Sequence, residues 1–264
     1  MTQLMTPRTW TAALLAAALL SACDWYEKNA VQEIAGPVPA GARIKFFNFG
    51  VNAPAVNFYA DARKMTAVGS TSGEESNLGV SYGGVGAGGF YTAIGAGQYT
   101  LAGKIAAATD KDLAISSLPA TLEDGKSYSF YQSGFYDATA KSVDAFIVED
   151  AFASQIDYAV AYVRFVHAIA NANPMTLYAK NTSTGDSVAV GAEVSYKAAG
   201  AFTALPPGVY DLRARYAGVS TNAISRTGVS FLAGRVYTIG ARGDITVTST
   251  TATNRPILDN TANR

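Results

Sequence analysis

Apolar and polar residues alternate along short stretches of this chain, with the two-residue period of a half-buried β-strand. The clearest stretch is 210–216 (YDLRARY), in which Tyr, Leu, Ala and Tyr alternate with Asp, Arg and Arg; 99–105 (YTLAGKI) keeps the pattern. Gly, Pro, Asn and Asp separate such runs, as expected at turns. Further runs of this kind are 44–49, 55–60, 113–118, 127–133 and 143–149. The pattern predicts an all-β protein.

The strand pattern occurs twice. Residues 42–60 (ARIKFFNFGVNAPAVNFYA) align with 161–179 (AYVRFVHAIANANPMTLYA) at an offset of 119. Three further matches follow in the same order at offsets of 114, 111 and 109, namely 80–82 with 194–196, 94–101 with 205–212 and 122–128 with 231–237. Because each copy holds short strands within about 100 residues, we expect two tandem immunoglobulin-like β-sandwich domains, at 41–150 and 160–264, joined by a linker at 151–159.

One match carries a more specific expectation. The pattern Leu205-x-x-Gly208-x-Tyr210 resembles the tyrosine-corner region of immunoglobulin-like domains, and Ile94, Gly97 and Tyr99 repeat it. In such a corner the tyrosine hydroxyl bonds to backbone a few residues upstream.

The N-terminus has the pattern of a processing signal. Arg8 precedes a short apolar run at 10–20, which is too short to span a bilayer comfortably. The sequence Leu-Ser-Ala-Cys at 20–23 resembles the lipobox of bacterial lipoproteins. That resemblance implies a signal peptide at 1–22, lipid attachment at Cys23, a tether at 23–40 and a position in the bacterial cell envelope, at its periplasmic face or on the cell surface. The alternative is a plain secretory signal in which Cys23 occurs by chance.

Composition narrows the class of partner. Lys plus Arg and Asp plus Glu each number 20, so no net charge favours nucleic acid. Charged residues are only 15% of the chain, whereas Tyr and Phe number 15 and 12, a balance typical of secreted β proteins. Cys23 is the one cysteine, so a lipid on its thiol would leave no disulfide and no thiolate ligand.

The opening segment of each copy resembles the hallmark of the domain of unknown function 4397 family. Val163-Arg164 and His167-Ala168 fit its V-R-x-x-H-A pattern, and Asn52-Ala53-Pro54 fits the loop that follows; Asn48-Phe49 departs from it. The resemblance implies secreted or lipid-anchored proteins, often in tandem, with a β-sandwich core. The family has no established activity.

Residues 79–89 (GVSYGGVGAGG) match both the G-x-S-x-G elbow of serine hydrolases and the G-x-G-x-x-G dinucleotide motif. Both motifs need a helix after the loop, and β-branched and aromatic residues follow here. The second copy reads EVSYKAAGA at 193–201, largely without glycine. We therefore predict that Gly83–Gly89 is a mobile loop or bulged edge specific to the first domain.

Four other patterns have a simple structural interpretation. His167, the one histidine, shares the strand face of Val163 and should be a hydrogen-bonded core or strand-end residue. We predict solvated loop rather than a calcium site at 110–112 (DKD), and turns at 125–127 (GKS) and at 242–244 (RGD), the last in a hairpin.

No residue pattern identifies a catalytic group, a cofactor or a metal site. Six aromatic residues could form a sugar platform, although core or cross-strand packing is commoner in a sandwich; they are Tyr82, Phe90, Tyr91, Tyr131, Phe135 and Tyr136. The sequence thus favours a non-enzymatic binding or structural module for a protein or glycan partner. The alternative is a carboxylate-dependent glycan-active enzyme of the envelope.

Overall fold

The computed structural model describes residues 41–66, 79–153 and 155–264, and in them strands account for all regular structure apart from one turn of 3-10 helix. The predicted all-β class is confirmed. No helix in the described part of the chain is long and apolar enough to cross a membrane. The expected signal peptide at 1–22, lipid site at Cys23 and tether at 23–40 lie outside the described residues and stay predictions.

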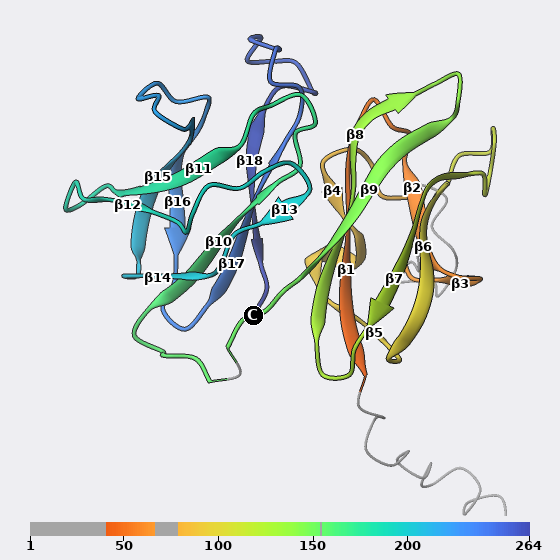
Figure 1. The fold of residues 1–264 in the computed structure, drawn as a ribbon, viewed down its shortest axis with the longest axis horizontal. Coiled ribbons are helices and arrows are strands. Elements are labelled where there is room, and N and C mark those ends of the chain that lie inside the picture. The colour runs from red at the N-terminus through yellow and green to blue at the C-terminus, as the bar shows by residue number, and fades with distance from the viewer. Residues whose placement is uncertain (1–40, 67–78, 154) are drawn as a thin grey trace, which may run out of the picture. The chain divides into compact units, whose positions relative to one another are not determined.

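The first half of the chain forms two sheets (Figure 1). A five-stranded sheet has the order β4-β1-β8-β9, with β5 also paired to β1, and a four-stranded sheet has the order β3-β2-β6-β7. The elements are β1 (Ala42–Val51), β2 (Val56–Ala60), β3 (Arg63–Lys64), β4 (Gly84–Val85), η1 (Gly86–Gly89), β5 (Thr92–Ile94), β6 (Gly97–Ile105), β7 (Ala114–Leu122), β8 (Ser127–Asp137) and β9 (Ser142–Glu149). All the strand runs expected in this half are found.

The second half repeats this topology. Its five-stranded sheet has the order β13-β10-β17-β18, with β14 also paired to β10, and its four-stranded sheet has the order β12-β11-β15-β16. The strands are β10 (Ala161–His167), β11 (Met175–Asn181), β12 (Ser187–Ala189), β13 (Ala198–Ala199), β14 (Thr203–Leu205), β15 (Gly208–Tyr216), β16 (Ile224–Phe231), β17 (Val236–Arg242) and β18 (Ile257–Ala262). Both halves lie within one compact unit, Ala40–Arg264.

Each half buries an apolar core between its two sheets. In the first half Phe46 of β1 stacks on Phe58 of β2, with ring centroids 5.2 Å apart, and both are fully buried. In the second half Phe165, Leu177 and Leu212 occupy one core cluster. Burial of each such side chain contributes about 1.5–3 kcal/mol, so these alternating positions hold the paired sheets together.

The register of the strands follows the sequence repeat. Lys45 of β1 is opposite Ser129 of β8, and Arg164 of β10 is opposite Thr238 of β17. These pairs differ by the offsets of 119 and 109 that the sequence repeat shows. The two tyrosine corners are also confirmed, because the Tyr99 hydroxyl donates to the Gly95 carbonyl at 3.0 Å and the Tyr210 hydroxyl to that of Pro206 at 2.7 Å.

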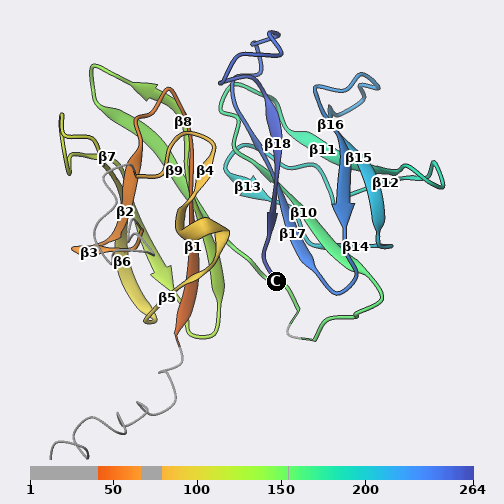
Figure 2. The same ribbon diagram turned by 180° about the vertical axis from the view of Figure 1, so that it is seen from behind.

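The glycine-rich stretch forms the interrupted edge of the first five-stranded sheet. Strand β4 pairs with β1 at Phe47 and Asn48, β5 pairs with it at 42–44, and η1 and Phe90–Tyr91 form a bulge between the two pairings (Figure 2). Gly83, Gly88 and Gly89 have φ values of 79°, 64° and 85°, which glycine adopts at little cost. The predicted bulged edge is therefore confirmed.

The expectation that this feature is specific to the first domain is wrong. In the second half β13 pairs with β10 at Val166 and His167, and β14 pairs with it at 161–163, so the same interruption occurs. Lys197 there takes a φ of 67°, the counterpart of Gly83. The backbone pairing produces the same bulge in both copies, although most of the glycines of the first copy are absent from the second.

Candidate functional site

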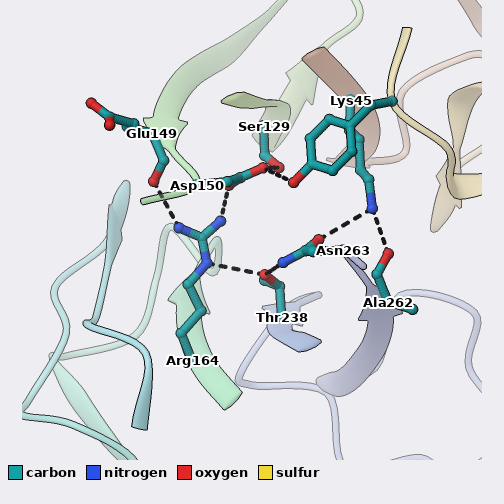
Figure 3. Close-up of polar contacts among 9 residues, drawn as sticks. Lys45, Ser129, Glu149, Asp150, Arg164, Thr238, Ala262 and Asn263 are labelled. Atoms are coloured by element: carbon teal, nitrogen blue, oxygen red, sulfur yellow. Dashed lines mark hydrogen bonds and ion pairs between the residues drawn. The ribbon is translucent and has the colours of Figure 1, made fainter. Parts of the chain in front are cut away.

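A cluster of buried polar side chains lies between the two five-stranded sheets (Figure 3). Its centre is two cations at equivalent strand positions, Lys45 on β1 and Arg164 on β10, which are 1% and 2% exposed. Buried cations are unfavourable unless they are paired and hydrogen-bonded. Each of them must therefore find its partners inside the protein.

Arg164 takes its partners mainly from the other half of the chain. Its guanidinium pairs with the carboxylate of Asp150, donates to the backbone carbonyl of Glu149 at 2.8 Å, and donates to Oγ1 of Thr238 at 3.0 Å. The ring of Phe202 lies 4.8 Å from the guanidinium carbon, at cation–π distance. Arg164 thereby connects β10 to the end of β9.

Lys45 makes the reciprocal contacts. Its ammonium donates to the backbone carbonyl of Ala262 at 2.5 Å and to Oδ1 of Asn263 at 3.1 Å, both at the end of β18. The ring of Tyr91 lies 4.4 Å from Nζ. Lys45 thus connects β1 to the end of β18 (Figure 3).

The two sets of contacts are related by the sequence repeat. Strand pairing places Val148 opposite Ser129 and Thr261 opposite Thr238, which makes Asp150 the counterpart of Asn263. Each cation therefore reaches across to the strand end that corresponds to the one reached by the other. This reciprocity is the defining property of an isologous, two-fold interface, here within one chain.

Asp150 is the anionic centre of the cluster. Besides Arg164, it accepts from the hydroxyl of Ser129 at 2.8 Å and from that of Tyr91 at 2.5 Å. Burial first, and then the neighbouring Asp150, raises the pKa of Tyr91 far above its ordinary value, so this hydroxyl stays a donor. These contacts of Asp150 are all with side chains of the protein itself, as expected of a carboxylate with a structural role.

Lys45 is the group of the cluster whose pKa is shifted closest to neutral pH. Burial lowers the pKa of Lys45 from 10.5 to about 8; the Asp150 carboxylate opposes this effect, and the Arg164 cation adds to it. Two cations share one carboxylate here, so a positive charge is left in excess on the Lys45 side.

An apolar contact flanks the polar cluster. Phe47, Phe49, Tyr131 and Phe146 of the first half form one buried cluster with the second half, whose members there are Val166 and Ala168. A Cβ added to Gly240 would lie 3.0 Å from the ring of Phe49, so glycine is what lets this ring approach β17. Burial of these rings makes the contact between the halves largely a hydrophobic one.

The residues of the sequence motifs have structural roles. Val80 forms an isolated bridge with Val56, and Ser81 and Tyr82 lie in the turn that follows, which leads into the interrupted edge rather than a helix. His167 is fully buried at the end of β10: Nε2 lies 3.1 Å from the Asn173 carbonyl, and Nδ1 accepts from the backbone N–H of Ile169. The predicted strand-end histidine is confirmed.

The Arg-Gly-Asp tripeptide at 242–244 is also engaged within the chain. Arg242 pairs with Asp259 and lies 4.9 Å from the ring of Tyr82, and Asp244 accepts from the Asn171 amide at 2.8 Å. The tripeptide leaves β17 for a connection that runs to β18 at Ile257, so the predicted hairpin has a long loop in place of a tight turn.

The two loop predictions hold. Residues 110–112 are exposed, and Lys141 pairs with Asp110 at 2.7 Å. Gly125 lies in a turn with a φ of 73°. Within the described ranges, no group of three or more His, Asp or Glu side chains is arranged to hold a metal ion.

The six aromatic residues considered as a platform do not form one surface. Tyr131 is 1% exposed and stacks on Phe47 at 4.5 Å, whereas Tyr82 and Tyr91 pair with cations of the interface. Phe90 is 77% exposed and Phe135 43% exposed, the latter near the end of β8.

Sequence reasoning missed the polar cluster itself. The match of Lys45 with Arg164 within apolar strands was visible in the repeat, and it was the available signal for a shared buried role. Asp150 had no such signal, because it falls at the boundary between a predicted strand and a predicted linker.

A cavity adjoins the cluster on each side. One, of about 360 Å³, is lined by the bulge at Gly88–Tyr91, by Lys45 and by the end of the chain from 260 to 264, with Arg235. The other, of about 500 Å³, is lined by the corresponding bulge at 199–202, by Arg164 and by residues 149–153 in part. Both cavities exist because the edge of the five-stranded sheet is interrupted beside Lys45 in one half and beside Arg164 in the other.

These features define an all-β protein in which two similar pairs of sheets meet through a buried reciprocal contact. Residues 161–264 match the model of the family described as "Domain of unknown function (DUF4397)". The predicted family is thus confirmed over that range. No curated protein sequence matches the chain.

Two solved structures resemble the chain, each described as a "putative cell adhesion protein". The one from Bacteroides fragilis NCTC 9343 is 10% identical, covers 85% of this chain and 98% of its own, and has a TM-score of 0.23. The one from Bacteroides ovatus ATCC 8483 is 11% identical, with coverages of 86% and 97% and a TM-score of 0.21. TM-scores this low do not establish a shared fold.

Proposed function

We propose that this chain is a bacterial envelope lipoprotein that acts as a non-enzymatic binding or structural module. Its lipid is attached at Cys23, residues 23–40 are the tether, and the domains at 41–150 and 160–264 are immunoglobulin-like β-sandwiches joined by 151–159. The partner is a protein or a glycan met at the periplasmic face or the cell surface.

The observation that carries this proposal is the structural use of the buried ionisable groups. Arg164 and Asp150 neutralise each other, and His167 has a hydrogen-bond partner at each ring nitrogen. A general acid or base must be able to reach a substrate proton. His167 is instead bonded within its own half, and the Arg164–Asp150 pair fixes one half of the chain against the other, which suits a rigid scaffold that presents its surface to a partner.

Two features support the immunoglobulin-like assignment. Both halves have the same order of strands in both of their sheets, and both have a tyrosine hydroxyl bonded to the backbone four residues upstream. That corner is a hallmark of immunoglobulin-like sandwiches.

The anchor is tested by fractionation of cells that express the chain. Cys23→Ser should move the protein from the membrane fraction to the soluble fraction, because two or three acyl chains are needed for a stable anchor. A neighbouring change, Ser21→Ala, keeps the thiol and a small residue and serves as the control. An unchanged membrane fraction for Cys23→Ser would refute the lipid site.

The binding role is tested with the full chain held in mild detergent. The protein should retain a defined glycan on an array, or a defined envelope protein after crosslinking in intact cells, without altering it chemically. Mass spectrometry of the retained glycan distinguishes binding from catalysis. Cleaved products would refute this proposal and favour the glycan-active enzyme.

A further inference from the structure

The cavity beside Lys45 has the composition of a ligand site. We call it the rim pocket and define it by the residues at 88–91, Lys45, Arg235 and the segment 260–264. Its volume of about 360 Å³ lies within the range of roughly 300–1,000 Å³ usual for small-ligand pockets. It exists because the sheet edge leaves β1 between Ile44 and Phe47, so that backbone does not cover Lys45 there.

The rim pocket is electropositive. Lys45 has two acceptors, Ala262 and Asn263, for the three donors of an ammonium group. Arg235 is exposed, and its guanidinium makes no hydrogen bond or ion pair in the described structure. Arg264 already interacts within the chain and is not counted. No Asp or Glu lines the pocket, whereas the corresponding pocket beside Arg164 includes Glu149.

The pocket also offers an apolar face. Phe90 is 77% exposed, which leaves its ring free to stack on a ligand.

From these groups we propose that the rim pocket binds an acidic sugar of the uronic-acid class. The carboxylate of the sugar bonds to Arg235 and lies in the field of Lys45, and the ring packs on Phe90. The ring-sized apolar face favours an acidic sugar over an inorganic anion. This inference rests on the proposed binding function and specifies the glycan.

The test is calorimetric titration of the full chain in mild detergent with trigalacturonate, and with its methyl ester as the uncharged equivalent. Trigalacturonate should bind, and the ester should bind at least about tenfold more weakly because a charge-assisted hydrogen bond is lost. Arg235→Gln should weaken trigalacturonate binding about tenfold, and Phe90→Ala about fivefold. Arg63→Gln, which removes an exposed arginine from β3, is the matched control and should leave binding unchanged.

The outcomes separate the pocket from the wider proposal. The rim-pocket proposal would be overturned if Arg63→Gln weakened trigalacturonate binding equally, or if Arg235→Gln and Phe90→Ala had no effect on it. Either result would still allow the chain to bind a glycan at another site. Inorganic phosphate that binds as tightly as trigalacturonate would overturn the sugar class. No binding of trigalacturonate at all would also overturn the rim-pocket proposal, while the array and crosslinking experiment would decide the binding function separately.

Discussion

Replacing Arg164 by methionine should destabilise the protein strongly, because it leaves Asp150 charged and buried without its cation. The two side chains are 2% and 0% exposed, and removing one member of such a pair costs about 3–5 kcal/mol. Asp150 would keep the hydroxyls of Ser129 and Tyr91, which places the cost of the lost charge near the lower limit. Thr238 and the Glu149 carbonyl would each lose a donor, at about 1 kcal/mol apiece.

The free energy of unfolding should therefore fall by about 5 kcal/mol. For a chain of this length that corresponds to a decrease in Tm on the order of 10 °C. Urea denaturation monitored by far-UV circular dichroism measures the change directly, and the m value shows whether unfolding remains one cooperative transition. Because Arg164 and Asp150 belong to different halves, loss of their contact should broaden or divide that transition.

A double-mutant cycle identifies the cause. Asp150→Asn combined with Arg164→Met should cost less than the sum of the single changes, by about 1–3 kcal/mol, because the uncompensated charge is gone. Lys141→Met is the matched control, since Lys141 pairs with Asp110 at the surface, where such pairs contribute about 0.2–1 kcal/mol. Additive effects in the cycle, or a loss no larger than that of Lys141→Met, would refute the proposed role of the Arg164–Asp150 pair.

Three further outcomes are expected. The pKa of Lys45 is lowered from 10.5 to about 8 in the folded chain, so the unfolded chain binds more protons between pH 8 and 10.5. The free energy of unfolding should therefore rise with pH across that range in urea titrations, and Lys45→Met should abolish the rise. Burial lowers the pKa of His167, so acidification below its ordinary value of 6.5 should cost stability in the wild type and less in His167→Asn, as thermal melts at several pH values would show. Tyr210→Phe removes the bond to Pro206 and should cost about 1 kcal/mol by urea denaturation, whereas a loss below 0.3 kcal/mol would contradict the corner's role (about 1 ± 0.5 is usual).

Local patterning was sufficient to predict the strands and their internal contacts. Tyr210 and His167 were placed correctly because strand parity fixes which face a side chain occupies, and the repeat supplied a second copy of each position. The register of β1 with β8 and of β10 with β17 agrees with the repeat offsets for the same reason. Such features depend on residues that are close in sequence or related by the repeat.

The contact between the halves was harder to predict, because it joins residues from separate strands at long range. Its clearest signal was the run FFNF at 46–49, in which neighbouring side chains on both faces of β1 are buried. A strand that is apolar on both faces is covered on both faces. Asp150 gave no comparable signal, since its burial depends on Arg164 and Tyr91, which lie far from it along the chain or in the other half.

The differences between the two copies explain why the polar cluster is strongly electropositive only on the Lys45 side. Asp150 neutralises Arg164, but its counterpart Asn263 offers Lys45 a neutral acceptor at 3.1 Å. Asn263→Asp would supply the missing carboxylate, so the pKa of Lys45 should return from about 8 toward 10.5, and trigalacturonate should bind more weakly in the rim pocket. Carbon NMR of the Lys45 side chain as a function of pH measures the first effect and calorimetry the second. If the pKa rose while affinity stayed the same, the charge of Lys45 would have no part in the pocket, and Arg235 alone would have to hold the anion.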